Sequence, residues 1–132
     1  TPLEVDTGVC FYADVALKES KEGIGTWMKP PVARAALRAS DGTWGPPEDM
    51  GPIPEQFATG PSAGIDAQGN ALVLWITEDE LLFRPWIAHR GWQPVVPLVF
   101  GLGFIRRLVT LSTGDSLMIW MNATGVWTAR FM

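Results

Sequence analysis

The sequence predicts an all-β fold of the β-propeller kind, with about three four-stranded antiparallel blades, the last one incomplete. Eleven prolines and 14 glycines interrupt short runs rich in Val, Ile, Leu, Trp and Thr. No apolar pattern with helical spacing persists for three turns, so strands are favoured over helices. Tryptophans recur along the chain with a single period, which indicates that the strands are organised in repeats.

The repeat is read from two series of tryptophans. Trp27, Trp75 and Trp120 lie 48 and 45 residues apart, each inside a short apolar run, and we expect all three in the core. Trp44 and Trp92 are also 48 residues apart, each just after a turn glycine and shortly before a proline. Two independent markers that share one period are typical of a repeat architecture with units of about 45 to 50 residues.

Each repeat divides into strands separated by turns, with blades expected at approximately 1–51, 52–97 and 98–132. The middle repeat is the most complete, and 66–69 is its first hairpin turn. The strands expected in this repeat are 62–67, 71–77, 81–89 and 92–98. Those expected in the first and third repeats are 25–29, 32–39, 44–50, 105–112, 116–122 and 126–132.

Residues 32–40 are the best helical candidate, because Ala, Leu and Arg favour helix. The alignment of repeats nevertheless puts this segment in the slot of a third strand. Tertiary context overrides propensity in such cases, so we expect a strand.

Composition excludes several classes of protein. The formal charge of −4, without a long run of either sign, argues against a nucleic-acid binder. The longest apolar stretch, 95–105, is broken by Pro97 and two glycines and is far short of the roughly 20 residues of a membrane span. Cys10 is the only cysteine, which favours a buried, inert thiol and leaves no Cys-based metal cluster. We expect no cofactor and no metal.

The number of blades predicts a partner. Propellers close with roughly four to eight blades, and this chain supplies about two and three-quarters. We therefore expect either self-association, as a dimer or trimer, or a longer propeller that contributes the remaining blades. The missing fourth strand of the last blade would come from a neighbouring chain or from sequence beyond this one.

Residues 38–51, 61–76 and 90–98 resemble bacterial β-propeller repeats of the broad sialidase-like, Asp-box type. The Asp-box turn is present in degenerate form at Ser40–Trp44, and His89–Trp92 keeps only the Gly and the Trp. The resemblance implies that this turn is structural and lies away from the binding face, so it implies no catalysis.

The residues also argue against catalysis. A sialidase needs converging arginines and a Tyr nucleophile, whereas Tyr12 is the only tyrosine and the arginines are scattered along the chain. Glu78, Asp79 and Glu80 could supply paired carboxylates for glycoside hydrolysis, but a solvated turn explains them more simply. His89 is the only histidine and lies beside a turn, where an exposed structural role is expected.

Binding remains as the expected activity. A sugar site would use Trp86 or Trp127 as a stacking platform, with Glu78, Asp79 or Arg84 bonding hydroxyls. The alternative for both tryptophans is packing between blades. The face expected to bind ligand is formed by loops at 28–31, 46–60, 77–80, 99–105 and 121–125.

Three functions are compatible with these features. The first is a non-catalytic module that recognises a glycan or a protein ligand, at the cell surface or outside the cell, or alternatively in the cytoplasm. The second is part of a propeller glycoside hydrolase or lyase whose other blades carry the catalytic groups. The third is a structural scaffold for oligomers. Fold alone does not decide among them.

Overall fold

The computed structural model of the chain describes residues 2–53, 60–77, 80–98, 104–122 and 125–131, the last two stretches mainly through their backbone. The described residues form strands and turns, without a helix. The strands are β1 (Phe11–Leu17), β2 (Gly23–Lys29), β3 (Val32–Arg38), β4 (Glu48–Pro52), β5 (Ser62–Ile65), β6 (Ala71–Ile76), β7 (Leu81–Ile87), β8 (Gly91–Trp92), β9 (Val96–Leu98), β10 (Phe104–Thr110), β11 (Ser116–Asn122) and β12 (Gly125–Phe131).

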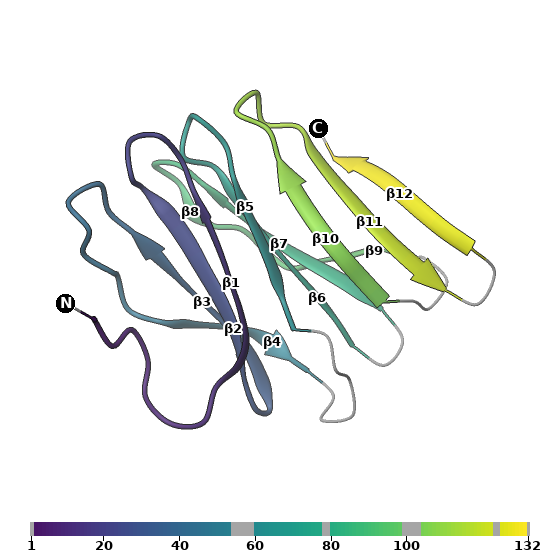
Figure 1. Cartoon of the computed structure of the whole chain (residues 1–132), viewed down its shortest axis with the longest axis horizontal. Coiled ribbons are helices and arrows are strands. Elements are labelled where there is room, and N and C mark those ends of the chain that lie inside the picture. Colours follow the sequence, from purple (N-terminus) through teal and green to yellow (C-terminus); the bar gives the residue numbers. More distant parts are fainter. Residues whose placement is uncertain (1, 54–59, 78–79, 99–103, 123–124, 132) are drawn as a thin grey trace.

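The strands form three antiparallel sheets that stand side by side in chain order (Figure 1). The first sheet has the order β1-β2-β3-β4, the second has β5-β6-β7-β8 with β9 also paired to β7, and the third has β10-β11-β12. Neighbours in each sheet are mostly neighbours in sequence, so each sheet is a meander, and none closes on itself. The all-β prediction is confirmed, and the helix-prone segment 32–40 contains strand β3.

The three sheets share one register. In each sheet the tryptophan of the second strand pairs with the residue seven positions later on the third strand. These pairs are Trp27 with Arg34, Trp75 with Leu82, and Trp120 with Trp127. The pairs between first and second strands match in the same way: Ala16 with Ile24, Gly64 with Leu72, and Val109 with Leu117. Positions in different sheets can therefore be compared one to one.

The hairpin between the first and second strands has the same hydrogen bonds in all three sheets. In the second sheet the Asp66 amide donates to the Asn70 carbonyl, and the Gly69 amide donates to the Asp66 carbonyl. Gly69 has φ +88°, as expected for a three-residue hairpin loop that ends in a left-handed residue. The predicted turn at 66–69 is confirmed. The other sheets repeat both bonds and the positive φ, with Lys21 and Gly114 in the place of Gly69.

The fourth strands differ from their predicted ranges. In the first sheet the strand predicted at 44–50 lies at 48–52, and only an isolated bridge joins Trp44 to Arg38. In the second sheet the strand predicted at 92–98 is divided into β8 and β9. The physical reason is proline: Pro46, Pro47 and Pro94 have no N–H group to donate to the strand ladder, so pairing is interrupted at each of them.

Two features of the N-terminal region were not predicted. Strand β1 was not among the expected strands, although it pairs with β2 along most of its length. Cys10, for which burial was expected, is exposed. It precedes β1 in a segment without strand structure, Pro2–Cys10, and most of this segment is exposed to solvent.

The main core lies between the first and second sheets. Trp75 is 1% exposed and Trp27 is 8% exposed, which confirms the prediction that these tryptophans are core residues. The side chain of Trp120 lies outside the described residues. The core cluster consists of Ile24, Met28, Ala33, Ala35, Met50, Ile53, Ala63, Ile65, Ala71, Val73 and Trp75.

Trp75 of β6 packs directly on the first sheet. Its ring lies on Gly51 of β4, so that a Cβ atom on Gly51 would be only 2.9 Å from Cζ2 of the indole. Real Cβ atoms essentially never come this close to another heavy atom. Because both faces of a buried indole need close neighbours, glycine at position 51 allows the sheets to pack without a gap.

We expect Gly51→Ala to lower the free energy of unfolding by about 1–3 kcal/mol, because the added methyl group must displace Trp75 or strand β4. Gly45→Ala is the matched control, since its Cβ would lie 3.6 Å from the nearest atom outside the adjacent residues, and its effect should stay within about 0.5 kcal/mol. Urea unfolding followed by tryptophan fluorescence measures both values. Equal effects would contradict the packing described here.

Candidate functional site

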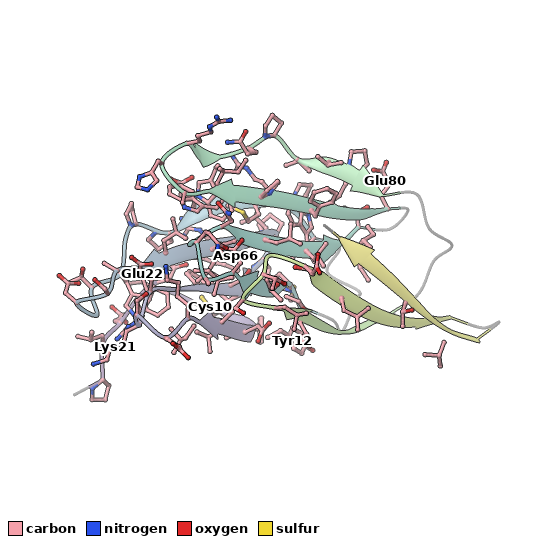
Figure 2. The ribbon with its side chains drawn as sticks, turned by 90° about the horizontal axis from the view of Figure 1, so that it is seen from above. Cys10, Tyr12, Lys21, Glu22, Asp66 and Glu80 are labelled. Atoms are coloured by element: carbon pink, nitrogen blue, oxygen red, sulfur yellow. The ribbon has the colours of Figure 1, made fainter. Side chains whose placement is uncertain are left out.

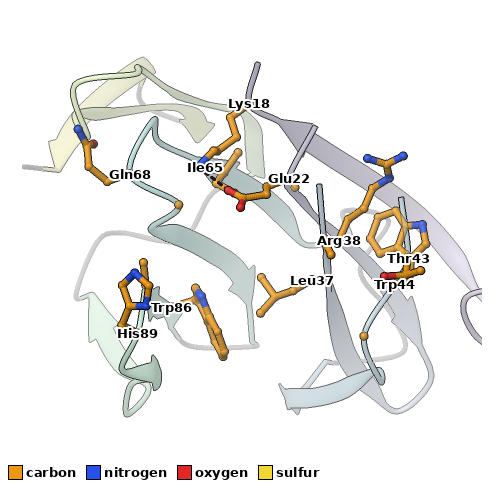
Figure 3. A pocket seen from close by; sticks show the side chains of 15 residues that line it. Lys18, Glu22, Leu37, Arg38, Thr43, Trp44, Ile65, Gln68, Trp86 and His89 are labelled. Carbon is orange, nitrogen blue, oxygen red and sulfur yellow. Dashed lines mark ion pairs between the residues drawn. The ribbon is translucent and has the colours of Figure 1, made fainter. Parts of the chain in front are cut away.

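A groove of about 620 Å³ opens between the first and second sheets (Figure 3). It lies at the end where the turns between first and second strands and between third and fourth strands meet. Four turns, from both sheets, therefore contribute residues to it. We call this space the inter-sheet groove. Its lining includes Lys18, Glu22, Leu37, Gln68, Trp86 and His89, together with Arg38, Thr43 and Trp44 of the first sheet.

Trp86 forms the aromatic wall of the inter-sheet groove, opposite Leu37 (Figure 3). Its ring packs edge-on against Trp92, with centroids 5.4 Å apart and an interplanar angle of 72°. The Arg84 guanidinium lies 5.4 Å from the centroid of Trp92, and its Nε donates to the Gln93 carbonyl at 2.9 Å. Trp92 is thus held between an arginine and Trp86, and the orientation of the Trp86 ring is fixed before any ligand arrives.

The rim of the inter-sheet groove is polar. Lys18 and Glu22 form an ion pair, drawn as a dashed line in Figure 3, and the hydrogen bond from Lys18 lowers the pKa of Glu22. The pair lies above Gly69, whose Cβ position is 3.6 Å from Lys18 Nζ and 3.8 Å from Glu22 Oε2. Gln68 and His89 are exposed, as expected for His89. The rim therefore offers an ammonium, a carboxylate, an amide and an imidazole group.

A second groove, of about 460 Å³, occupies the equivalent place between the second and third sheets. There Asp66 stands at the position of Lys18, and Asn70 at that of Glu22. The Asp66 carboxylate is buried (Figure 2) and accepts hydrogen bonds from the Gln68 amide and from the Asn70 amide and side chain, at 2.9–3.1 Å. Asn70 Oδ1 accepts from the Ala88 amide at 3.0 Å. These polar groups stabilise the hairpin, so the first groove is the better ligand site.

Only some of the predicted site residues lie at the inter-sheet groove. Trp86 lines the inter-sheet groove, and Arg84, two residues earlier on β7, is engaged with Gln93 and Trp92. Glu78 and Asp79 lie outside the described residues. Trp127 belongs to β12, but its side chain is also outside them.

The inter-sheet groove and the expected binding face lie at opposite ends of the sheets. The expected loops include those between second and third strands, whereas the groove is built from the other turns. Sequence reasoning missed Lys18, Glu22 and Gln68. The signal that could have found them is the repeat itself, because Lys18 and Glu22 are equivalent to Asp66 and Asn70 of a turn that was predicted.

The degenerate Asp-box segment forms a compact turn. The Asp41 carboxylate accepts hydrogen bonds from the Thr43 amide at 2.9 Å and from its hydroxyl at 2.7 Å, and these bonds lower the pKa of Asp41. The Trp44 ring extends over Gly25, on the face of the first sheet that points away from the second. This turn stabilises the β3–β4 connection, and Thr43 and Trp44 also belong to the lining of the inter-sheet groove (Figure 3).

A cluster of basic side chains surrounds Asp6. Its carboxylate accepts a hydrogen bond from Trp27 Nε1 at 2.8 Å and lies 3.2 Å from Lys29 Nζ and 3.0 Å from Arg34 Nη1. Arg34 Nε is also 2.9 Å from a carboxylate oxygen of Asp49, an ion-pair contact without hydrogen-bond geometry. The charge of Arg34 is thus matched by the chain's own carboxylates, which argues against a carboxylate ligand there.

No protein-family model matches the chain, and a comparison with curated proteins finds no match either. Among the described residues, no three His, Cys, Asp or Glu side chains are grouped so as to hold a metal ion. The same residues include no helix long and apolar enough to cross a membrane.

The Asp6 cluster makes the free energy of unfolding depend on pH. Burial raises the pKa of Asp6, but hydrogen bonds from the indole, a backbone amide and an ammonium group, with the guanidinium charge, outweigh it and lower the pKa to about 2. In the unfolded chain the pKa is about 3.9. The ionised carboxylate therefore stabilises the fold above about pH 4, and this contribution is lost as the pH falls towards 2.

We expect Asp6→Asn to lower the free energy of unfolding at pH 7 by about 1–3 kcal/mol, the value of charge-assisted hydrogen bonds. The difference from the unmodified chain should shrink between about pH 4 and pH 2. Urea unfolding at a series of pH values measures it. Glu4→Gln removes an equal charge from an exposed side chain and is the control. A difference that does not depend on pH would contradict this account.

Proposed function

We propose that this protein is a non-catalytic recognition module that binds a glycan in the inter-sheet groove. The observation that carries this proposal is the Trp86 ring, fixed by Trp92 and facing a groove with a polar rim. A sugar ring has an apolar face of C–H groups and an edge of hydroxyl groups. An aromatic wall beside hydrogen-bonding side chains complements both parts.

The size and shape of the groove agree with this proposal. Its volume of about 620 Å³ falls in the range of roughly 300–1,000 Å³ typical of small-molecule sites. The rim groups of Glu22, Gln68 and His89 can donate or accept hydrogen bonds, as recognition of hydroxyls requires. Glu22 is paired with Lys18, and the ion pair holds it as a carboxylate acceptor, which suits binding better than general acid catalysis.

We further propose that the three sheets are successive blades of a β-propeller. The support is the common register of the sheets and their arrangement in chain order, in which β5 of the middle sheet contacts both β1 and β10 (Figure 1). In a propeller, four-stranded meanders are repeated radially in the same way. Grooves between blades then recur at equivalent positions, as the two described here do.

The proposal predicts that Trp86→Ala weakens glycan binding by about 5- to 30-fold, equivalent to about 1–2 kcal/mol of lost stacking. The probes are an array of neutral and acidic oligosaccharides, followed by calorimetric titration of the best one. Phe11→Ala is the control, because this exposed aromatic ring lies at the end of β1 away from Lys18 and does not line the groove, and the change should leave the affinity within about twofold.

Binding to no oligosaccharide, or equal affinities of the two variants, would contradict the glycan site. A reducing-end assay on the same oligosaccharides tests the non-catalytic part of the proposal. Hydrolysis abolished by Glu22→Gln would show an enzyme instead.

A further inference from the structure

The outward faces of the first and third sheets carry apolar side chains that water contacts. Val15 and Leu17, on β1, are 57% and 58% exposed, and both pair with glycines of β2 on the face that points away from the second sheet. Val109 and Leu117, which pair with each other on the third sheet, are 43% and 50% exposed. Two such faces on one chain indicate surfaces that are covered in the functional assembly.

The internal repeat shows what covers the face of the first sheet. Val15 and Leu17 correspond in register to Ala63 and Ile65 of the second sheet, which are only 4% and 8% exposed. Ala63 and Ile65 belong to the core cluster formed with the preceding sheet. The first sheet therefore presents the same surface as the second, but the described chain places no sheet before it.

The third sheet can be compared with the first in the same way, for the face that a following sheet would cover. Leu117 corresponds to Ile24 of the first sheet, which is 0% exposed because the second sheet covers it. Val109 corresponds to Ala16, which packs against the same core. The outward face of the third sheet is thus equivalent to faces of the first and second sheets, and in each of those sheets the next sheet covers that face. The two outward faces are complementary halves of an interface that the chain already makes twice.

The segment before β1 supplies a second, independent observation. Trp75 packs on Gly51, which belongs to the fourth strand of the preceding sheet. The equivalent tryptophan, Trp27, meets Asp6 of the N-terminal segment instead, at 2.8 Å. Residues around Asp6 therefore lie where the fourth strand of a preceding sheet would lie. Among the described residues β12 pairs only with β11, so its other edge is open to pairing with a further strand.

We propose that a second copy of this chain docks the outward face of its third sheet onto the outward face of the first sheet. Residues 2–6 of one copy then lie beside β12 of the other, in the place of the fourth strand. The contact is head-to-tail, because each copy contributes a different face to it. Two copies can therefore form the contact twice, which covers both outward faces of both chains and closes a ring. A second copy is the occupant because the complementary surface is on this same chain, in the register of its internal interfaces.

Sedimentation equilibrium of the chain at about 10 μM tests this proposal. We expect a mass of twice 14.4 kDa for the unmodified chain. Leu17→Lys and Leu117→Glu should each raise the dissociation constant at least about tenfold, because each places an unpaired charge in the interface. Val95→Glu changes a similarly exposed side chain outside these faces and is the matched control.

Mixing the two variants gives the sharpest outcome. In a head-to-tail pair, one interface joins Lys at position 17 to Glu at position 117, and the other interface is unmodified. An equimolar mixture should therefore recover the dimer that each variant lacks alone. A monomeric unmodified chain, a dimer that neither substitution weakens, or a mixture that stays monomeric would each overturn the proposal. Circular dichroism of each variant confirms that it is folded, since both positions are exposed.

Discussion

The packing of Trp75 onto Gly51 is the contact on which the rest of the structure depends. At this point the indole ring lies on the backbone of β4 with no room for a Cβ atom, so the contact limits how far apart or how close the two sheets can lie. The buried cluster of alanines, isoleucines, methionines and a valine fills the space around this contact. At the hairpin ends of the two sheets, the space between them forms the inter-sheet groove.

Tryptophan spacing predicted the second and third strands well because a large apolar side chain in a short strand must be buried, and burial fixes its register. The strands around Trp27 and Trp75 and the hairpin at Asp66–Asn70 followed from this pattern. Strand β1 was missed because its hairpin has Lys21, with φ 71°, where the other two hairpins have glycine. Without the glycine, the turn resembles a charged, solvated loop.

The candidate site could be predicted only in part. Trp86 was identified from its place in a third strand, but its neighbours in the groove come from four turns that meet only in the folded sheets. Lys18 and Gln68, about 50 residues apart, approach because the first hairpins of adjacent sheets stack on one another. Such proximity depends on the spacing between sheets, and composition and local pattern carry no information about that distance.

The most direct test of the packing between the first and second sheets is the proton NMR spectrum of Gly51. Packing of Trp75 on Gly51 predicts nuclear Overhauser contacts between the Gly51 α protons and the indole ring, together with a strong upfield shift of at least one α proton. Random-coil shifts and no contact to the indole would show that the sheets do not pack in this way. The groove, the shared register between sheets and the proposed assembly would then lose their common basis.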